Sequence, residues 1–455
     1  MNSLGKFSIT PQESLDFARA SGDYNPLHLD PVAARRTRFG HTLIHGVCGT
    51  IRALDLLLRR RGSRSTLASI KVKYNKPATQ GQELEAFEQT TDGVTRIELY
   101  ADGTRCQVID IEFAQSPAPS PSSSARLSAC DADQELPLDL RIEDCNGVSG
   151  SVALGWNEAL MTSLFPNATR HLAPAQLAVL LASTRIVGMK CPGLHSVFAR
   201  LEIDFQAPAT GTAARENASL VYRALSTDPR IDRVELELLC TGVQGRIEAF
   251  FRPPPVRQAT FDQIATLVSG DEFCQQKALV IGGSRGLGEV ISKVLAAGGA
   301  QMMITYAAGR DDALAVADDI GQNRAMPAVA PYNVIEGTLG KELQDFCASV
   351  THIYYLASPT ISKSDGKRWD RPLFARYCDF YIDGLAMLLQ QVMQHRDNSR
   401  ELQVFIPSSV FLEQNIKGFD EYIAAKSAAE AYARCFEKNH RHCTVVAPRL
   451  PRLYT

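Results

Sequence analysis

The order of apolar and polar positions repeats itself in the first part of the chain. Apolar residues recur with a helical period over residues 47–58 and again over residues 173–186. Each segment is followed by a strand-like alternation with an aromatic residue and, three positions later, the sequence Pro-Ala-Thr, at residues 69–84 and 198–211. One repeat at a spacing of 131 residues, counted from Tyr74 to Phe205, predicts two copies of one domain-sized unit.

Strand patterns then separate the two copies from the rest of the chain. Further alternating segments at residues 96–113 and 233–251 indicate antiparallel strands, so that each copy is an α+β unit with one central helix. Toward the C-terminus, short apolar runs alternate with helical stretches, the runs lying at residues 278–281, 301–305, 353–356, 403–406 and 444–446. This alternation predicts an α/β unit with a doubly wound parallel sheet of the Rossmann type.

Proline and serine mark the boundaries between these parts. Residues 116–128 read SPAPSPSSSARLS and carry no apolar period, which is typical of a linker. Three consecutive prolines at 253–255 end the second copy. We therefore expect units at 1–115, 135–252 and 275–455, joined by linkers at 116–134 and 253–274.

Composition narrows the class of protein. The formal net charge of −2 gives no global attraction for nucleic acid or anionic lipid, and no apolar run approaches the length of a membrane span. The first ten residues lack the order of a signal peptide, so a cytoplasmic protein is expected. The eleven cysteines show neither paired nor zinc-site spacing, which favours free, mostly buried thiols and no metal.

Two stretches of the first copy carry residues suited to acid–base chemistry. Residues 21–31 read SGDYNPLHLDP and residues 39–46 read FGHTLIHG. Adding water to a conjugated double bond requires a base and an acid, which Asp23 and His28 can provide together on one water molecule. The backbone N–H at Gly46, where the central helix is expected to begin, can stabilise the negative charge of an enolate-like oxygen. The alternative is that Asp23 and Asn25 only shape a turn and that His28 is a core residue.

These stretches closely resemble the signature of MaoC-like, R-specific enoyl-CoA hydratases, which have the hotdog fold. The resemblance implies that Asp23 and His28 are catalytic, that Gly46 contributes to the oxyanion site and that Asn25 positions the substrate. His41 and His45 are expected to be structural. In the family a helix hydroxyl supports the catalytic Asp, and here the corresponding position falls near Ile51, so the support of Asp23 is expected to differ.

The second copy lacks this chemistry. Its loop before the helix, residues 165–174, has neither Gly-Asp nor an Asp followed five residues later by His. Cys191 and His195 lie close in sequence, but no third orienting group is evident, and we do not expect a nucleophile there. The layout is similar to double-hotdog hydratases, in which a catalytically empty copy replaces a second subunit and forms one wall of the acyl tunnel.

The C-terminal unit carries a second motif set. Residues 281–288 read IGGSRGLG, between an expected strand and an expected helix, the context in which a glycine-rich loop holds a pyrophosphate. Tyr422 and Lys426 are spaced as Y-x-x-x-K, and Ser409 precedes Tyr422 by thirteen residues. Together they resemble the short-chain dehydrogenase/reductase family, which implies that these three residues are catalytic. The resemblance assigns cofactor contacts to Gly282, Ser284, Arg285, Gly286, Leu287, Gly288, Asn333 and Ala357, and also to Tyr422 and Lys426.

Details of this unit bear on its cofactor and activity. An ammonium at Lys426 should lower the pKa of the Tyr422 phenol. No acid follows the second strand, and Arg285 is suited to a 2′-phosphate, so NADP as NADPH is expected. Tyr381 stands where the family has a catalytic Asn. Only 29 residues follow Lys426, so we expect a C-terminally shortened sheet, and either the substrate site is open or the reductase domain is degenerate.

The combined expectation is a bifunctional acyl-thioester enzyme. It would be an (R)-3-hydroxyacyl dehydratase or enoyl hydratase joined to an NADPH-dependent 3-ketoacyl reductase. Its substrates would be acyl chains on coenzyme A or on an acyl carrier protein, and a homodimer is expected. One alternative is a single-activity hydratase with a reductase-like scaffold. The other is a non-enzymatic acyl- or carrier-binding module, which would not need the carboxylate of Asp23.

Overall fold

The chain folds as two compact units, Met1–Pro255 and Val256–Thr455. The structure is a computed structural model that describes residues 1–115, 127–129, 135–206, 218–364, 368–451 and 453. Most of the predicted linker at 116–134 and the Pro-Ala-Thr of the second repeat lie outside the described residues. Each unit is described by itself below.

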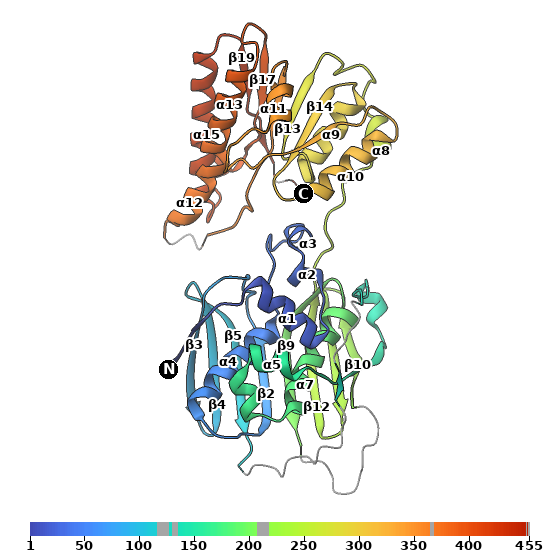
Figure 1. Cartoon of the computed structure of the whole chain (residues 1–455), viewed down its shortest axis with the longest axis vertical. Helices are drawn as coiled ribbons and strands as arrows, with labels where there is room; N and C mark the ends of the chain where they lie inside the picture. The colour runs from blue at the N-terminus through green and yellow to red at the C-terminus, as the bar shows by residue number, and fades with distance from the viewer. Residues whose placement is uncertain (116–126, 130–134, 207–217, 365–367, 452, 454–455) are drawn as a thin grey trace. The chain divides into compact units, whose positions relative to one another are not determined.

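One continuous antiparallel sheet of ten strands forms the frame of the first unit (Figure 1). The strand order is β1-β3-β4-β5-β2-β9-β12-β11-β10-β7. The first copy contributes one half of the sheet, with strands β1 (Asn2–Phe7), β2 (Leu67–Tyr74), β3 (Leu84–Thr91), β4 (Val94–Ala101) and β5 (Thr104–Phe113). The second copy contributes the other half, with strands β7 (Ser149–Ala153), β9 (Ser196–Phe205), β10 (Ser219–Asp228), β11 (Arg233–Cys240) and β12 (Val243–Phe251).

The pairing of β2 with β9 joins the two copies. In this antiparallel pair Lys71 lies directly opposite Glu202, and these two positions are separated by the 131 residues of the sequence repeat. Strands then follow in mirrored order on either side of the pair. Two residues at equivalent repeat positions can face each other only on a local twofold axis. The repeat in the sequence is therefore a pseudo-dimer built into one sheet.

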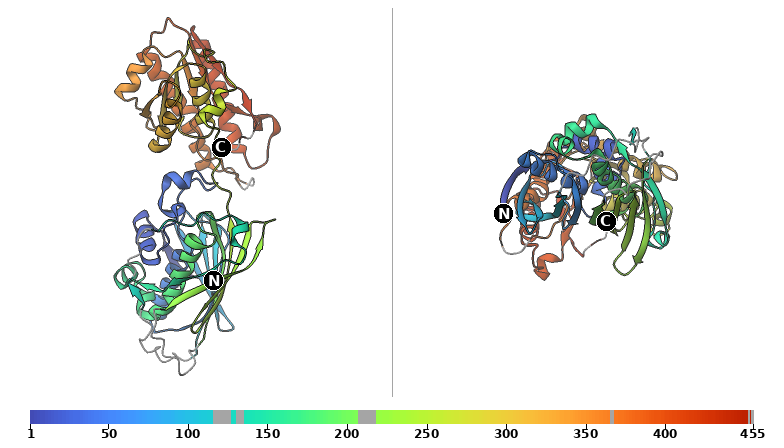
Figure 2. Two further views of the ribbon diagram at one scale, coloured as in Figure 1. Left: turned by 90° about the vertical axis from the view of Figure 1, so that its right-hand side faces the viewer. Right: turned by 90° about the horizontal axis from the view of Figure 1, so that it is seen from below.

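The central helices of the two copies are α4 (Gly46–Arg61) and α7 (Pro174–Arg185), the latter extended by a π-helical turn, η2 (Ile186–Lys190). Both have largely buried residues and belong to one hydrophobic core with the inner face of the sheet. Figure 2 shows the helices of this unit gathered on one face of the sheet. The remaining helices are α1 (Pro11–Ser21), α2 (Pro26–Leu29), α3 (Pro31–Arg35), η1 (Ile142–Cys145), α5 (Glu158–Leu164) and α6 (Pro166–His171). This arrangement confirms the predicted double hotdog.

The two alternating segments that end the copies are hairpins. Residues 96–113 comprise most of β4 and all of β5, and the turn between them holds Asp102 and Gly103 at φ values of 48° and 71°. Asp-Gly at positive φ is the preferred two-residue turn between antiparallel strands. In the second copy, β11 and β12 are joined by Thr241 and Gly242, and of these two residues only Gly242 has a positive φ, 74°.

The second unit has a six-stranded parallel sheet in the order β15-β14-β13-β16-β17-β19. In chain order this is 3-2-1-4-5-6, the doubly wound arrangement of dinucleotide-binding folds, as predicted. The strands are β13 (Lys277–Ile281), β14 (Gln301–Tyr306), β15 (Ala328–Pro331), β16 (His352–Tyr355), β17 (Leu402–Phe405) and β19 (Cys443–Val446). The longer helices are α9 (Gly286–Ala297), α10 (Arg310–Gly321), α11 (Lys341–Cys347), α12 (Arg371–Cys378), α13 (Gly384–His395) and α15 (Asp420–Asn439). Across the described residues of both units, no helix is long and apolar enough to cross a bilayer.

The predicted linker at 253–274 needs a correction. The chain forms a short helix, α8 (Phe261–Ala265), and both Phe261 and Ile264 are buried in the core of the second unit. The N–H of Phe261 donates to Asp319 of α10 at 3.0 Å. A capping box between Thr260 and Gln263 starts the helix, a signal that the neighbouring prolines obscured. The linking stretch is therefore shorter than predicted.

Candidate active sites

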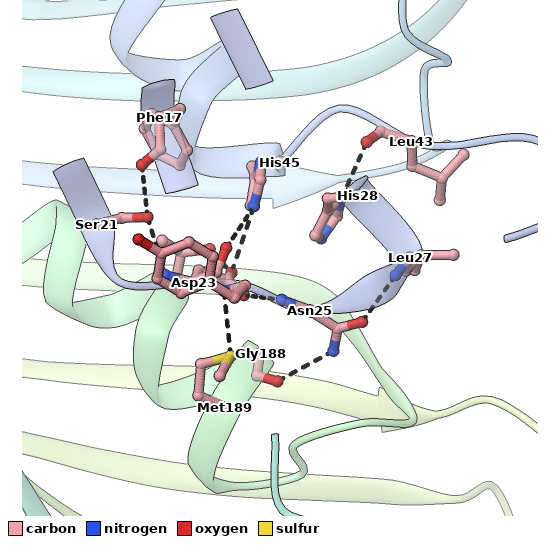
Figure 3. Close-up of polar contacts among 12 residues, drawn as sticks. Phe17, Ser21, Asp23, Asn25, Leu27, His28, Leu43, His45, Gly188 and Met189 are labelled. Carbon is pink, nitrogen blue, oxygen red and sulfur yellow. Dashed lines mark hydrogen bonds and ion pairs between the residues drawn. The ribbon is translucent and has the colours of Figure 1, made fainter. Parts of the chain in front are cut away.

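Asp23 lies in the loop between α1 and α2, buried at 1% exposure (Figure 3). Its Oδ2 accepts a hydrogen bond from the Thr184 hydroxyl at 2.7 Å, and its Oδ1 accepts one from the N–H of Asn25 at 3.2 Å. Burial raises the pKa of Asp23. The nearby His28, the two hydrogen bonds and the charge of Arg185 oppose this shift. The carboxyl group is thus held in place and biased toward its protonated form.

The hydroxyl that supports Asp23 comes from the second copy. Thr184 lies on α7, 161 residues along the chain from Asp23. In the first copy's own helix, the position expected to support Asp23 falls near Ile51. Its neighbour Thr50 does not contact Asp23 but donates to the Gly46 carbonyl and to the side chain of Gln107, at 3.2 Å each. The expected alteration around Asp23 is therefore a change in the source of the hydroxyl, which the second copy supplies.

His28 lies on α2, and its hydrogen bond fixes its tautomer. Nδ1 is 3.0 Å from the carbonyl oxygen of Leu43. Because a carbonyl only accepts, Nδ1 carries the proton of the neutral ring and Nε2 keeps its lone pair. Burial lowers the pKa of His28, although the charge of Asp23 opposes the shift. The ring is therefore favoured in the neutral form with a nitrogen able to take up a proton.

His45, which the sequence suggested was only structural, adjoins both residues. Its ring stacks on His28 with centroids 3.9 Å apart, and its Nε2 donates to the backbone carbonyl of Asp23 at 3.0 Å. Burial holds the pKa of His45 well below its usual range. Asp23, His28 and His45 each offer one ligand atom within 4.8 Å of the others, a spacing that a transition metal could also use.

Asn25 fastens this loop to the second copy. Its Oδ1 accepts from the N–H of Leu27, which caps α2, and its Nδ2 faces the carbonyls of Gly188, Gly193 and Leu194 at 3.0–3.3 Å. Both ends of the amide are therefore used within the protein. These contacts position the loop, and the substrate-positioning role of Asn25 stays a prediction.

Gly188 marks the closest approach of the second copy to the site. It lies in the π-helical turn η2, and a Cβ at this position would be 2.1 Å from Oδ1 of Asp23. Only glycine allows this contact. Neither Gly188 nor Thr184 could be recognised from local sequence, since both act across the pseudo-dimer.

Gly46 is the first residue of α4, as expected for an oxyanion site. The N–H groups in the first turn of a helix have no intrahelical acceptor. The ring of Tyr74 lies against Gly46, because a Cβ there would be 2.7 Å from Cε1 of the ring. Gln107 donates to the Gly46 carbonyl at 3.1 Å, which fixes the start of the helix.

Cys191 and His195 have separate partners, in keeping with the expectation that they are not a nucleophile pair. The sulfur of Cys191 lies 3.4 Å from that of Cys145, and both side chains are buried. Nε2 of His195 pairs with Asp139 at 3.2 Å.

In the second unit, the predicted cofactor loop lies at the carboxyl end of β13 and leads into α9, which begins at Gly286. The loop is tightly folded, because a Cβ at Gly288 would be 2.1 Å from the Gly282 carbonyl oxygen. Gly282 in turn lies against the backbone of Ala357, which follows β16. Ser284 is buried, Leu287 is half-buried and Arg285 is exposed. The loop thus has the shape and helix N-terminus that a pyrophosphate requires.

The structure brings Ser409, Tyr422 and Lys426 together. Ser409 lies in a short strand, β18 (Ser408–Ser409), that pairs with β20 (Arg449–Leu450), and the other two residues lie on α15. Burial raises the pKa of Tyr422, and a hydrogen bond with Ser409 opposes this shift. Lys426 donates from Nζ to the carbonyl of Pro407 at 2.8 Å, and burial lowers its pKa to about 7. The expectation that Lys426 lowers the Tyr422 pKa is therefore not met, since burial governs both groups.

Tyr381 occupies a central place in this site. It is buried in a π-helical turn, η3 (Asp379–Asp383), and Lys426 Nζ lies 3.9 Å from the centroid of its ring. Its hydroxyl is 2.7 Å from Oγ of Ser358. Asn333, the remaining predicted cofactor contact, follows β15, where its amide donates to Glu336.

Comparison with known proteins identifies two domains in the chain. Residues 5–104 match the model of the MaoC like domain, and residues 276–448 match that of the short chain dehydrogenase. The chain therefore joins a MaoC-like domain to a short-chain dehydrogenase domain.

Individual relatives cover parts of the chain. It is similar to a fatty acyl-CoA reductase of Acinetobacter baylyi (28% identity over 163 residues, 35% of this chain and 55% of the relative). It is also similar to the peroxisomal multifunctional enzyme type 2 of Drosophila melanogaster (30% identity over 99 residues, 21% of this chain and 14% of the relative). The chain thus spans about half of the first relative and a small part of the second. A solved MaoC-like dehydratase matches with a TM-score of 0.38 at 15% identity, over 54% of this chain and 96% of that one.

Proposed function

We propose that the chain is a bifunctional acyl-thioester enzyme, an enoyl hydratase or (R)-3-hydroxyacyl dehydratase joined to an NADPH-dependent 3-ketoacyl reductase. The observation that carries this proposal is the pair of buried Asp23 and half-buried His28, with Nε2 of His28 left as an acceptor and Thr184 holding the carboxyl group. Burial shifts the two pKa values in opposite directions, as an acid and a base of one site require.

The hydratase mechanism follows from these protonation states. Neutral His28 takes a proton from water through Nε2, and the oxygen adds to carbon 3 of the enoyl thioester. Asp23, protonated, delivers its proton to carbon 2, and the reverse sequence gives dehydration. The N–H at Gly46 stabilises the negative charge on the thioester oxygen while the new bonds form.

In the reductase site, NADPH would supply the hydride that reaches carbon 3 of a 3-ketoacyl thioester. Ser409 would hold the carbonyl oxygen by a hydrogen bond, and Tyr422 would pass it a proton. Lys426 would orient the nicotinamide ribose and restore the proton of Tyr422. Arg285 supports the choice of NADPH, because it is exposed in the glycine loop and positions 306–308, at the end of β14, hold no acid.

The two reactions share carbon 3, which is the reason for placing them in one sequence. In the reductive direction the 3-ketoacyl group becomes (R)-3-hydroxyacyl and then trans-2-enoyl. We propose acyl chains on coenzyme A or on a carrier protein as substrates, and a homodimer as the assembly.

An assay with two readouts tests the proposal. Loss of crotonyl-CoA absorbance reports hydration, and loss of NADPH absorbance with acetoacetyl-CoA reports reduction. Asp23→Asn should abolish only the first signal and Tyr422→Phe only the second, and hydration should survive chelation of metal ions if it is acid–base chemistry. Hydration without NADPH consumption would leave the second unit as a scaffold. Full hydration by the Asp23 variant would refute the mechanism.

The fatty acyl-CoA reductase relative favours a second candidate for the reductase unit, reduction of the thioester carbonyl itself. The two reductions differ in one product. Reduction at carbon 3 leaves the thioester intact, whereas reduction of the thioester to an aldehyde releases a free thiol. Thiol released in step with NADPH consumption would therefore favour the second candidate.

A further inference from the structure

Lys426 has few polar partners for a half-buried cation. It lies on α15 one turn after Tyr422, and its Nζ donates to the carbonyl of Pro407 at 2.8 Å. An ammonium group has three N–H donors, and this bond uses one of them. In the part of the chain that the structure describes, Lys426 takes part in no ion pair. Another contact must therefore hold the remaining charge in place.

The negative charge that acts on Lys426 is that of Glu430, one turn further along α15. Its carboxylate is engaged elsewhere. Oε1 accepts a hydrogen bond from the Ser408 hydroxyl at 2.6 Å, and Arg449 donates to the two oxygens at 3.0 and 2.9 Å. Glu430 thus favours the ammonium form of Lys426 without pairing with it.

The face of the Tyr381 ring provides the missing contact. Nζ of Lys426 lies 3.9 Å from the ring centroid, and Tyr381 is 3% exposed. A cation over an aromatic face is attracted by the quadrupole of the ring, more strongly where water is excluded. Tyr377 and Tyr422 surround this ring, and burial raises the pKa of all three phenols, so they are uncharged at neutral pH. The ring therefore favours the ammonium form without adding a charge.

The hydroxyl of Tyr381 anchors the ring. It lies 2.7 Å from Oγ of Ser358. Oγ of Ser358 donates its one proton to the carbonyl of Pro359 at 3.0 Å, so the proton in the first contact belongs to Tyr381. The phenol proton is thus used within the protein, while Lys426 lies over the face of the ring.

A π-helical turn presents this ring to Lys426. Tyr381 is the middle residue of η3, which joins α12 to α13, and both η3 and α12 pack against α15 (Figure 1). A π-helical turn is rare and often marks a functional site. The hydroxyl of Tyr355, on β16, donates to the carbonyl of Phe380 at 2.6 Å and ties the turn to the sheet. The backbone and the hydroxyl together therefore fix where the ring lies.

We propose that Tyr381 is a positioning residue of the reductase site, which holds the ammonium group of Lys426 at the face of its ring, one helical turn from Tyr422. The inference rests on the proposed reductase activity, and Tyr381 stands where the reductase family has its asparagine. Because burial lowers the pKa of Lys426, the amine needs a partner that favours its charged form. The ring provides this partner and fixes the direction of Nζ.

Two variants of Tyr381 separate the ring from the hydroxyl. Tyr381→Phe keeps the aromatic face and loses the bond to Ser358, whereas Tyr381→Leu loses both. With acetoacetyl-CoA and NADPH at neutral pH, kcat should fall about tenfold in the leucine variant and stay within about twofold in the phenylalanine variant. Losing the ring lowers the pKa of Lys426, so the ammonium form is lost at lower pH. The alkaline limb of the pH–rate profile should therefore move down by about one pH unit in the leucine variant alone.

Tyr377→Leu is the matched control. It removes a buried ring from the same cluster, and among the described residues no cation lies over the ring of Tyr377. The alkaline limb should stay at its wild-type position in this variant, whatever the fall in kcat. A limb that moves equally in both leucine variants, equally in both variants of Tyr381, or in none of them would overturn the proposal.

Acetylation of lysine amines keeps the test independent of catalysis. Acetic anhydride reacts with the neutral amine, so the acetylation rate of Lys426 over a pH series, followed by mass spectrometry on the full chain, reports its titration. The midpoint should be about one pH unit lower in Tyr381→Leu than in the wild type and unchanged in Tyr381→Phe. Lys277, whose Nζ lies 4.6 Å from the centroid of the Phe346 ring, is an internal control and should be acetylated alike in all three proteins.

The two readouts separate the failure of the contact from the failure of the reductase. If no substrate is reduced, the proposed reductase fails, yet a midpoint that moves only in the leucine variant still supports the role of the ring. A midpoint that does not move refutes that role even where reduction is normal.

Discussion

The two hotdog copies each send one polar side chain from the central helix to the loop of the other copy, with opposite results. From α7, Thr184 donates a hydrogen bond to the carboxyl group of Asp23. From α4, Asp55 accepts hydrogen bonds from the N–H groups of Asn167 and Ala168 at 2.7 and 2.8 Å, at the start of α6. The first contact supports a carboxyl group, whereas the second satisfies two backbone N–H groups and the side-chain amide of Asn167, whose Nδ2 donates to Oδ2 of Asp55 at 3.0 Å.

This difference fits the proposal that only the first copy is catalytic and that the second copy is still needed. A carboxylate at a helix N-terminus is a stabilising cap, so Asp55 secures the second copy's loop in a fixed role. Thr184 on α7 donates only a neutral hydroxyl, so the carboxyl group of Asp23 is held in orientation and can still gain or lose its proton. Under the proposed function, the second copy thus supports the catalytic loop of the first.

The largest effect is expected from Asp23→Asn, which removes the acid. Hydration should fall by about 10²- to 10⁴-fold, measured by crotonyl-CoA absorbance. Burial raises the pKa of Asp23 in the folded protein, so its contribution to the free energy of unfolding is lost as pH rises above the unfolded-state pKa. An amide carries no such charge, and the Asp23→Asn variant should therefore be more resistant to urea at neutral pH. A variant that is both inactive and less stable would indicate a structural role.

Gly188→Ala tests how closely the copies meet. The added Cβ would lie 2.1 Å from Oδ1 of Asp23, so the loop must move. A displacement of this size should cost about 100-fold in hydration. Gly340→Ala is the control, because a Cβ there meets open space, and it should leave hydration unchanged. Activity that survives in the Gly188 variant would mean that the two copies can separate without harm.

Thr184→Val removes the hydroxyl and retains the shape of the side chain. Losing a hydrogen bond to a buried carboxyl group costs about 1–3 kcal/mol, which predicts a fall of roughly tenfold in kcat. The hydroxyl also lowers the pKa of Asp23, so its loss raises that pKa and moves the alkaline limb of the pH–rate profile to higher pH. Thr184→Ser should restore both properties. If kcat falls at every pH and the alkaline limb of the pH–rate profile does not move, the lost hydrogen bond is not the cause.

Asp55→Ala is the mirror experiment and should affect hydration least. Leaving the N–H groups of Asn167 and Ala168 without their acceptor should lower the free energy of unfolding by about 1–3 kcal/mol, measured in urea. The kcat for hydration at low temperature should stay within about twofold of the wild type. A collapse of kcat in a folded variant would show that the second copy's loop also takes part in catalysis.

Periodicity and contiguous motifs were sufficient for most of the fold. The helical period at 47–58 corresponds to α4, and the apolar run at 278–281 to β13. The strand β15 (Ala328–Pro331) was missed, because a segment of four residues that ends in proline is too short to show a strand-like alternation. The helix α8 was taken for a linker because prolines precede it.

The site was predictable only where its residues are close in sequence. Asp23, Asn25 and His28 belong to one loop, and the glycine motif to one turn. Thr184 and Gly188 act from the other copy, at a separation that no local pattern encodes. The protonation of Lys426 also depends on burial, a property of the folded unit that residue spacing does not report.

The pairing of β2 with β9 determines how the protein responds to dilution. When two identical subunits form such a seam, the support of each catalytic loop disappears as the protein is diluted and the subunits part. Here both halves belong to one chain, so Thr184 meets Asp23 at an effective concentration set by the covalent connection. The specific rate of hydration should therefore remain constant over any dilution at which the polypeptide stays folded.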